Sequence, residues 1–90
     1  MTSKERAGFR SLANTLQPIL QIGKNGISDN TIKQVDDALE ARELIKITVL
    51  ETAGEGTREL SHEVAGKVNA EVIQVIGSKF VLYRKSKKNN

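Results

Sequence analysis

Apolar residues recur along this chain with two different periods, and each period predicts one kind of secondary structure. A spacing of three or four residues places side chains on one face of a helix and predicts helices over residues 2–17, 29–42 and 57–69. Short runs rich in β-branched and apolar residues predict strands over residues 19–22, 44–50, 72–76 and 79–83. Residues 52–56 are predicted to form a flexible loop. The predicted order of elements is therefore α-β-α-β-α-β-β.

Local signals indicate where the helices begin and end. Thr2 and Glu5 have the spacing of a capping box, in which each side chain bonds the other residue's backbone amide. Pro18 ends the first helix, because proline disfavours helical backbone at the residue before it. Ser28 is a favourable N-cap for the second helix. The predicted apolar face of the first helix consists of Phe9, Leu12, Ala13 and Leu16.

These elements favour an α/β two-layer domain with a four-stranded mixed sheet. A helix that connects two neighbouring strands makes them parallel, whereas Gly77-Ser78 between the last two runs predicts an antiparallel hairpin. The strands are almost continuously apolar, so we expect partial cover on both faces of the sheet. We predict a single domain over residues 1–84, followed by a basic, polar tail over residues 85–90 that is frayed.

Composition narrows the functional classes. The chain has 90 residues, enough for one modest core, and no cysteine, which excludes disulfides, zinc–thiolate sites and cysteine nucleophiles. A single histidine, His62, excludes a multi-histidine metal site, and we expect neither a metal nor a cofactor. Apolar runs are far shorter than the roughly 20 residues of a membrane span, and residues 1–5 do not resemble a secretion signal. We therefore expect a cytoplasmic protein without membrane contact.

Charge is distributed unevenly along the chain, although the formal net charge is only +3. Residues 29–76 contain five basic and ten acidic residues, whereas residues 77–90 contain five basic residues and no acidic one. Such segregation can create a basic surface that attracts polyanions, of which nucleic acid is the commonest. The alternative is that the basic tail only increases solubility.

The segment most indicative of binding is a G-x-x-G loop between the first strand and the second helix. Gly23 and Gly26 allow a tight turn and close approach of a ligand to the backbone. The helix that follows offers free amides to an anion, Lys24 adds a positive charge, and Asn25 can bond phosphate or sugar. The loop matches neither a P-loop nor a dinucleotide-binding fingerprint. The alternative is an ordinary strand-to-helix turn.

Other polar residues offer weaker candidates for chemistry. His62 has no nucleophile securely beside it and is interpreted as a surface histidine, so we expect no enzymatic activity. Tyr83 could stack on a base or pack in the core, and both possibilities stay open. A cluster of carboxylates on the second helix could hold a divalent cation, but a solvated polar face is favoured. This cluster comprises Asp36, Asp37, Glu40 and Glu43.

Three motifs, in this order, carry a resemblance to a known family. They are residues 22–28 (IGKNGIS), residues 38–47 with Ala38-Leu39 and Glu43-Leu44-Ile45-Lys46-Ile47, and residues 72–84 with Val81-Leu82-Tyr83-Arg84. With these motifs the chain resembles the YhbY family, the stand-alone bacterial form of the CRM domain. The resemblance covers nearly the whole chain and implies a fold like the C-terminal domain of translation initiation factor three. It also implies an RNA-binding module, with the GxxG loop and adjacent basic surface as the contact. Unlike a KH loop, this one joins a strand to a helix.

The resemblance further implies association with precursors of the large ribosomal subunit. We predict a monomeric, non-enzymatic RNA-binding protein that acts in assembly of this subunit by docking on rRNA. The predicted RNA contacts are Gly23, Lys24, Asn25, Gly26, Ser28, Arg84, Lys85, Lys87 and Lys88. The alternative is a protein-interaction module that binds a basic ribosomal protein through its acidic second helix.

Overall fold

The computed structural model describes residues 1–54 and 56–87 and confirms the predicted order of elements. A short 3-10 helix, Glu51–Ala53, occupies part of the segment predicted to be a flexible loop, because the backbone there closes i→i−3 hydrogen bonds onto Leu50 and Glu51. The main elements are α1 (Ser3–Ala13), β1 (Pro18–Ile22), α2 (Asp29–Arg42), β2 (Leu44–Val49), α3 (Thr57–Val68), β3 (Glu71–Ile76) and β4 (Lys79–Tyr83).

The four strands form one mixed sheet in the order β1-β2-β4-β3. β1 and β2 run parallel, with α2 as the connection between them, and β4 is antiparallel to both β2 and β3. The last strand along the chain therefore lies inside the sheet, and β1 and β3 form its edges. The mixed sheet and the β3–β4 hairpin agree with the sequence prediction.

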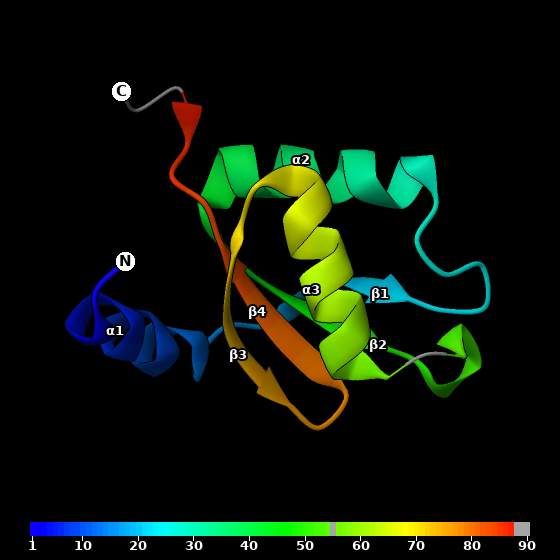
Figure 1. Cartoon of the computed structure of the whole chain (residues 1–90), viewed down its shortest axis with the longest axis horizontal. Helices are drawn as coiled ribbons and strands as arrows, with labels where there is room; N and C mark the ends of the chain where they lie inside the picture. Colours follow the sequence, from blue (N-terminus) through cyan, green and yellow to red (C-terminus); the bar gives the residue numbers. More distant parts are fainter. Residues whose placement is uncertain (55, 88–90) are drawn as a thin grey trace.

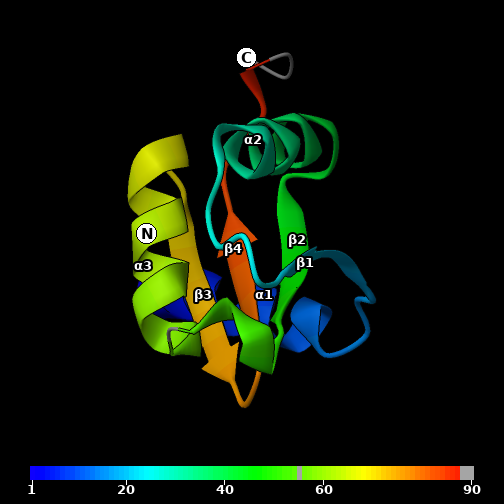
Figure 2. The same cartoon turned by 90° about the vertical axis from the view of Figure 1, so that its right-hand side faces the viewer.

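Helices cover both faces of the sheet, but unequally (Figure 1). α2 and α3 lie on one face, where Leu39 and Val64 pack with Ile47 and Phe80 in the main core. α1 lies on the opposite face, where Ala13 packs in a smaller cluster with residues of β3 and β4. Figure 2 shows α3 and the sheet from the side, with α1 partly hidden behind the strands. None of the helices within residues 1–54 and 56–87 combines the length and apolar character that a membrane crossing requires.

α1 is attached to one end of its sheet face by two contacts. The ring of Phe9 stacks on that of Tyr83, with centroids 4.1 Å apart. The guanidinium of Arg6 forms an ion pair of 3.2 Å with Glu71 and donates to the carbonyl oxygen of Val72. Tyr83 thus packs on α1, as one of the two possibilities for its ring predicts. Among residues 1–54 and 56–87, α1 is the only helix that contributes to the apolar cluster on this face.

α1 ends at Ala13, four residues earlier than the apolar pattern predicts. After Ala13 the backbone forms i→i−3 bonds, from Thr15 N to Leu12 O and from Leu16 N to Ala13 O, and the Thr15 hydroxyl donates to Leu12 O. These bonds take the carbonyls that another helical turn would need. Leu12 was predicted to face the core, but it is 60% exposed.

Candidate nucleic-acid interface

The G-x-x-G segment forms a closed turn at the end of β1. Gly26 N donates to Gly23 O at 2.8 Å, so Lys24 and Asn25 occupy the two central positions of the turn. Both of these side chains are exposed. Gly26 has φ +61°, in the left-handed region that glycine adopts most readily. The turn therefore displays a cation and an amide at its tip.

Gly23 has little room for a side chain, and its backbone angle is not in the left-handed region. A Cβ atom built on Gly23 would lie 3.3 Å from Leu50 Cδ1 and 3.5 Å from Thr52 Oγ1. Leu50 N also donates to Ile22 O at 2.8 Å, which joins the start of the turn to the end of β2. The turn is thus held against the segment after β2, and its tip projects away from the sheet (Figure 1).

Ser28 connects the turn to α2 as the predicted N-cap. Its hydroxyl accepts from Thr31 N at 3.1 Å and lies 3.0 Å from Thr31 Oγ1. The first helical hydrogen bond runs from Ile32 N to Ser28 O, so the amides of Asp29 and Asn30 precede the helical ladder. Amides at this position, together with the helix dipole, favour an anion. The side chain of Ser28 has a structural role in this arrangement.

Arg84 is placed differently from the prediction, which assigned it to the basic surface. Its side chain is only 12% exposed and pairs with Asp36 at 2.6 Å and with Glu40 at 3.3 Å. Its guanidinium also donates to Val68 O at 2.9 Å and to Asp36 O at 3.1 Å. Arg84 therefore joins the end of β4 to α2 and to the end of α3. Because β4 is central in the sheet, the residue after it lies beside α2 and the end of α3.

The segment after Arg84 also contacts α2 and its C-cap where the structure describes it. Ser86 is 2% exposed, its amide donates to Glu43 Oε2 at 2.7 Å, and its hydroxyl donates to Glu40 Oε2 at 2.9 Å. Lys87 N donates to the same Glu40 oxygen at 2.9 Å. The side chains of Lys85 and Lys87 are exposed. Lys88, another predicted RNA contact, lies outside the described residues.

These contacts change the interpretation of the acidic side of α2. Asp36, Glu40 and Glu43 bind Arg84 and the chain after it, and Asp37 pairs with Lys33 at 3.4 Å. A basic protein partner would have to compete with these internal contacts for the same carboxylates. Within residues 1–54 and 56–87, no three carboxylate or histidine side chains are grouped as a metal would require. His62 is exposed on α3.

The structure separates the predicted RNA contacts into two groups at opposite ends of α2. Gly23, Lys24, Asn25, Gly26 and Ser28 lie at its N-terminal end, whereas Arg84, Lys85 and Lys87 lie beside its C-terminal half (Figure 1). α2 has 14 residues, which at a rise of about 1.5 Å per residue separates its ends by roughly 20 Å. One RNA that contacts both groups must extend along this distance.

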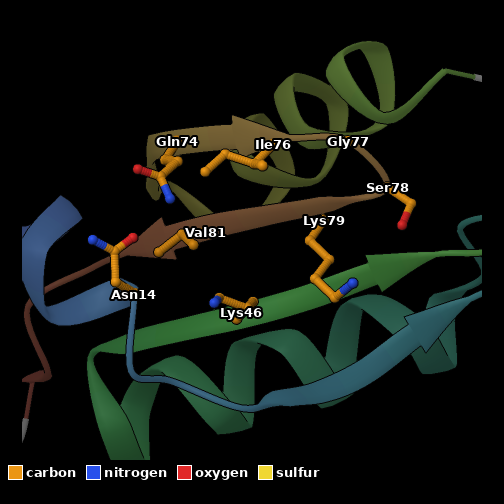
Figure 3. Close-up of a pocket in the computed structure, with 8 residues that line it drawn as sticks. All are labelled: Asn14, Lys46, Gln74, Ile76, Gly77, Ser78, Lys79 and Val81. Carbon is orange, nitrogen blue, oxygen red and sulfur yellow. The ribbon is translucent and has the colours of Figure 1, made fainter.

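Two lysines that the sequence prediction did not include lie on the sheet face that carries α1. Lys46 of β2 and Lys79 of β4 line a hollow of about 370 Å³, together with Asn14 at the end of α1 (Figure 3). The burial of β2 alternates residue by residue, with Ile45, Ile47 and Val49 buried and the residues between them partly exposed. Lysine between two isoleucines was the available signal for an open face.

A family model, the CRS1 / YhbY (CRM) domain, matches residues 1–84. The chain belongs to the CRM family. A CRM relative in Bacillus subtilis, named "Probable RNA-binding protein YqeI", is 43% identical over 89 residues, which cover 99% of this chain and 93% of that protein. In Arabidopsis thaliana, the chloroplastic CRS2-associated factor 1 is 25% identical over 84 residues, which make up only 12% of that larger protein.

A solved structure has the same CRM fold. The solution structure of SAV1595 from Staphylococcus aureus, described as a candidate RNA-binding protein, superposes with a TM-score of 0.81 at 46% identity. The match covers 100% of this chain and 94% of that one. The CRM match in this chain extends through Arg84, and the lysines of the following segment lie beyond it.

Proposed function

We propose that this CRM protein binds RNA through the G-x-x-G turn, and that it acts as a binding factor, not as an enzyme. One observation carries the proposal: a closed, exposed turn presents Lys24 and Asn25 immediately before the N-terminus of α2. Lys24 and the amides that precede the helical ladder of α2 can then contact one anion, and a phosphate group suits both. The names given to the relatives from B. subtilis and S. aureus support RNA as the polyanion.

The proposed binding mode is electrostatic docking on the RNA backbone. Phosphate contacts position a protein on its nucleic acid without reading sequence, and released counterions supply much of the free energy. Asn25 can bond a phosphate or ribose oxygen beside Lys24. The exposed Lys85 and Lys87 extend the contact at the far end of α2.

The test replaces the tip of the turn and keeps both glycines. Lys24→Asp with Asn25→Asp exchanges one positive charge and one neutral amide for two negative charges. Both side chains are exposed, so the free energy of unfolding changes by under about 1 kcal/mol. We expect RNA affinity to fall at least about tenfold, which corresponds to roughly 1.4 kcal/mol.

A matched control separates position from net charge. Lys67→Glu with Gln34→Glu makes the same change in net charge on exposed helical surfaces of α3 and α2. We expect this control to bind RNA within about threefold of the parent, since neither residue lies in the turn or in the first turn of α2. Equal losses in the two variants, or a folded turn variant that binds like the parent, would contradict the assignment of the turn.

We further propose that the RNA is rRNA in precursors of the large ribosomal subunit, and that the protein works there as a cytoplasmic monomer. The resemblance to the YhbY family supports this role. Sedimentation of cell extracts tests it: the protein should migrate with precursor particles and be depleted from mature large subunits. Equal occupancy of precursor and mature particles, or recovery only with messenger RNA, would contradict it. His62→Ala should leave this distribution unchanged.

A further inference from the structure

The sheet face that carries α1 has two rows of side chains beyond the row that α1 covers. The covered row contains Leu44, Tyr83 and Glu71, which are aligned across β2, β4 and β3. Strand register then defines the next two rows, one of Lys46, Val81 and Gln74 and the other of Thr48, Lys79 and Ile76. Val81 is itself buried in the cluster with Ala13 of α1, whereas Lys79 and Ile76 are exposed. The hollow described above lies over these two rows (Figure 3).

The hollow has the size and boundaries of a small-ligand site. Its volume is about 370 Å³, near the lower end of the range for small-molecule pockets. Asn14 bounds one side and the hairpin turn at Gly77 and Ser78 bounds the other (Figure 3). A folded RNA stem is too large for such a space, whereas a single nucleotide is of suitable size.

The charges that line the hollow favour an anion. Lys46 lies opposite Val81, and Lys79 is two residues from Val81, so the two lysines are diagonal neighbours about 7–8 Å apart at their Cα atoms. The lining contains no acidic residue, and within residues 1–54 and 56–87 neither lysine forms an ion pair. Like charges at this spacing repel each other. One phosphate between the two ammonium groups would remove this repulsion.

The remaining lining residues suit a nucleobase. Val81 is only 2% exposed, so the apolar surface against which a base can pack is mainly that of Ile76, which is 59% exposed. Asn14 and Gln74 present side-chain amides, which both donate and accept hydrogen bonds as the edges of bases do. This combination of two cations, two amides and an apolar surface matches a nucleoside monophosphate unit.

The hollow lies at the same end of the sheet as the G-x-x-G turn. Val49 N, at the end of β2, donates to Ser78 O at 2.6 Å, and Leu50 N donates to Ile22 O at 2.8 Å. The end of β2 thus has the turn on one side and the hairpin on the other. A strand of RNA bound at the turn can continue across the end of β2 into the hollow.

We infer that this hollow binds one nucleotide of a single-stranded RNA segment, with its phosphate between Lys46 and Lys79 and its base toward Asn14 and Gln74. The inference rests on the proposed RNA binding and adds a second contact, specific for unpaired RNA. Paired RNA cannot insert a base into the hollow, so the discrimination follows from shape and from the accessible base edge.

The experiment compares two variants of the full chain. Lys46→Gln with Lys79→Gln removes both charges from the hollow, and Lys4→Gln with Lys67→Gln removes two exposed charges elsewhere. Affinity is measured by fluorescence anisotropy for a labelled single-stranded RNA of twelve nucleotides and for a fully paired RNA hairpin. We expect the hollow variant to lose about tenfold in affinity for the single strand relative to the control variant, and less than about threefold for the hairpin.

Two further readouts test the geometry. If both lysines share one phosphate, the slope of log affinity against log salt becomes shallower by about 0.7 for the single strand. The thermal midpoint of the RNA-free hollow variant stays equal to that of the parent or rises, because a repulsive pair has been removed.

Equal single-strand affinities of the hollow variant and the control variant would overturn the inference and leave the proposed turn intact. Equal losses for the single strand and the hairpin would also overturn it, because the hollow would then act only through charge. A parent that binds neither RNA would overturn the proposed function itself.

Discussion

Arg84 is the side chain whose replacement should separate a structural role from an RNA contact most clearly. Its guanidinium donates to Asp36, Glu40 and Val68, and so holds α2 and α3 to the end of β4. Arg84→Met keeps most of the apolar stem and removes all of these hydrogen bonds. We expect a protein that is substantially less stable but binds RNA normally while folded.

The expected decrease in the free energy of unfolding depends on the acidic side chains that lose their partner when Arg84 is replaced. Removal of one partner from a buried ion pair costs about 3–5 kcal/mol. The Asp36 side chain is 53% exposed and can be hydrated, whereas that of Glu40 is only 21% exposed. Glu40 also keeps its bonds from Ser86 and Lys87, so the loss should fall near the lower limit, about 3 kcal/mol. For a domain of this size that is a decrease in Tm of about 12–24 °C.

Thermal and urea unfolding, combined with RNA binding at a temperature where both proteins are folded, provide the assay. Lys85→Met is the matched control, because Lys85 is the adjacent residue and is exposed. We expect Lys85→Met to change Tm by less than about 3 °C. An Arg84→Met protein with the Tm of the parent and a tenfold weaker RNA affinity would refute the structural assignment.

Two further predictions concern solution conditions. RNA affinity should decrease with salt with a log–log slope of roughly −3 to −5, as about four to six phosphate contacts require, and a slope near zero in titrations would contradict electrostatic docking. Hydrogen bonds from the backbone and hydroxyl of Thr2 lower the pKa of Glu5 below its ordinary value of 4.5. The ionised form therefore stabilises the fold above that value, and the stabilisation is lost as pH falls through the lowered pKa. In urea unfolding at a series of pH values, the advantage of the parent over Glu5→Gln should be present near neutral pH and disappear in acid; an advantage independent of pH would contradict this.

The sequence predicts most of this fold because the relevant signals are local. The Thr2–Glu5 capping box and the Ser28 N-cap each depend on residues within three or four positions, and both are present in the structure. The boundaries of β4 agree with the apolar run because Gly77, with φ +56°, closes the hairpin before it. The G-x-x-G turn is also a local feature that the sequence can predict, since its hydrogen bond joins residues three positions apart.

Features that depend on strand order could not be predicted from local sequence signals. Nothing near Arg84 in the sequence shows that β4 is central, so the residue looked like the start of a basic tail. Its partners Asp36 and Glu40 are 48 and 44 residues away. The joint placement of Lys46 and Lys79 in one hollow likewise follows from the pairing of β2 with β4. Long-range pairing therefore determines which charges are exposed.

The internal position of β4 also has a consequence for how the chain acquires its structure during synthesis. β1, α2 and β2 leave the ribosome before β4, yet β2 finds its second neighbour only in β4. Until then, one edge of an apolar strand has unpaired amides and carbonyls, which can pair with other chains. The sheet cannot be completed until residues 79–83 are available. A chain that ends before them therefore exposes the unpaired edge of β2. A chain truncated before β4 should therefore aggregate more than the full chain.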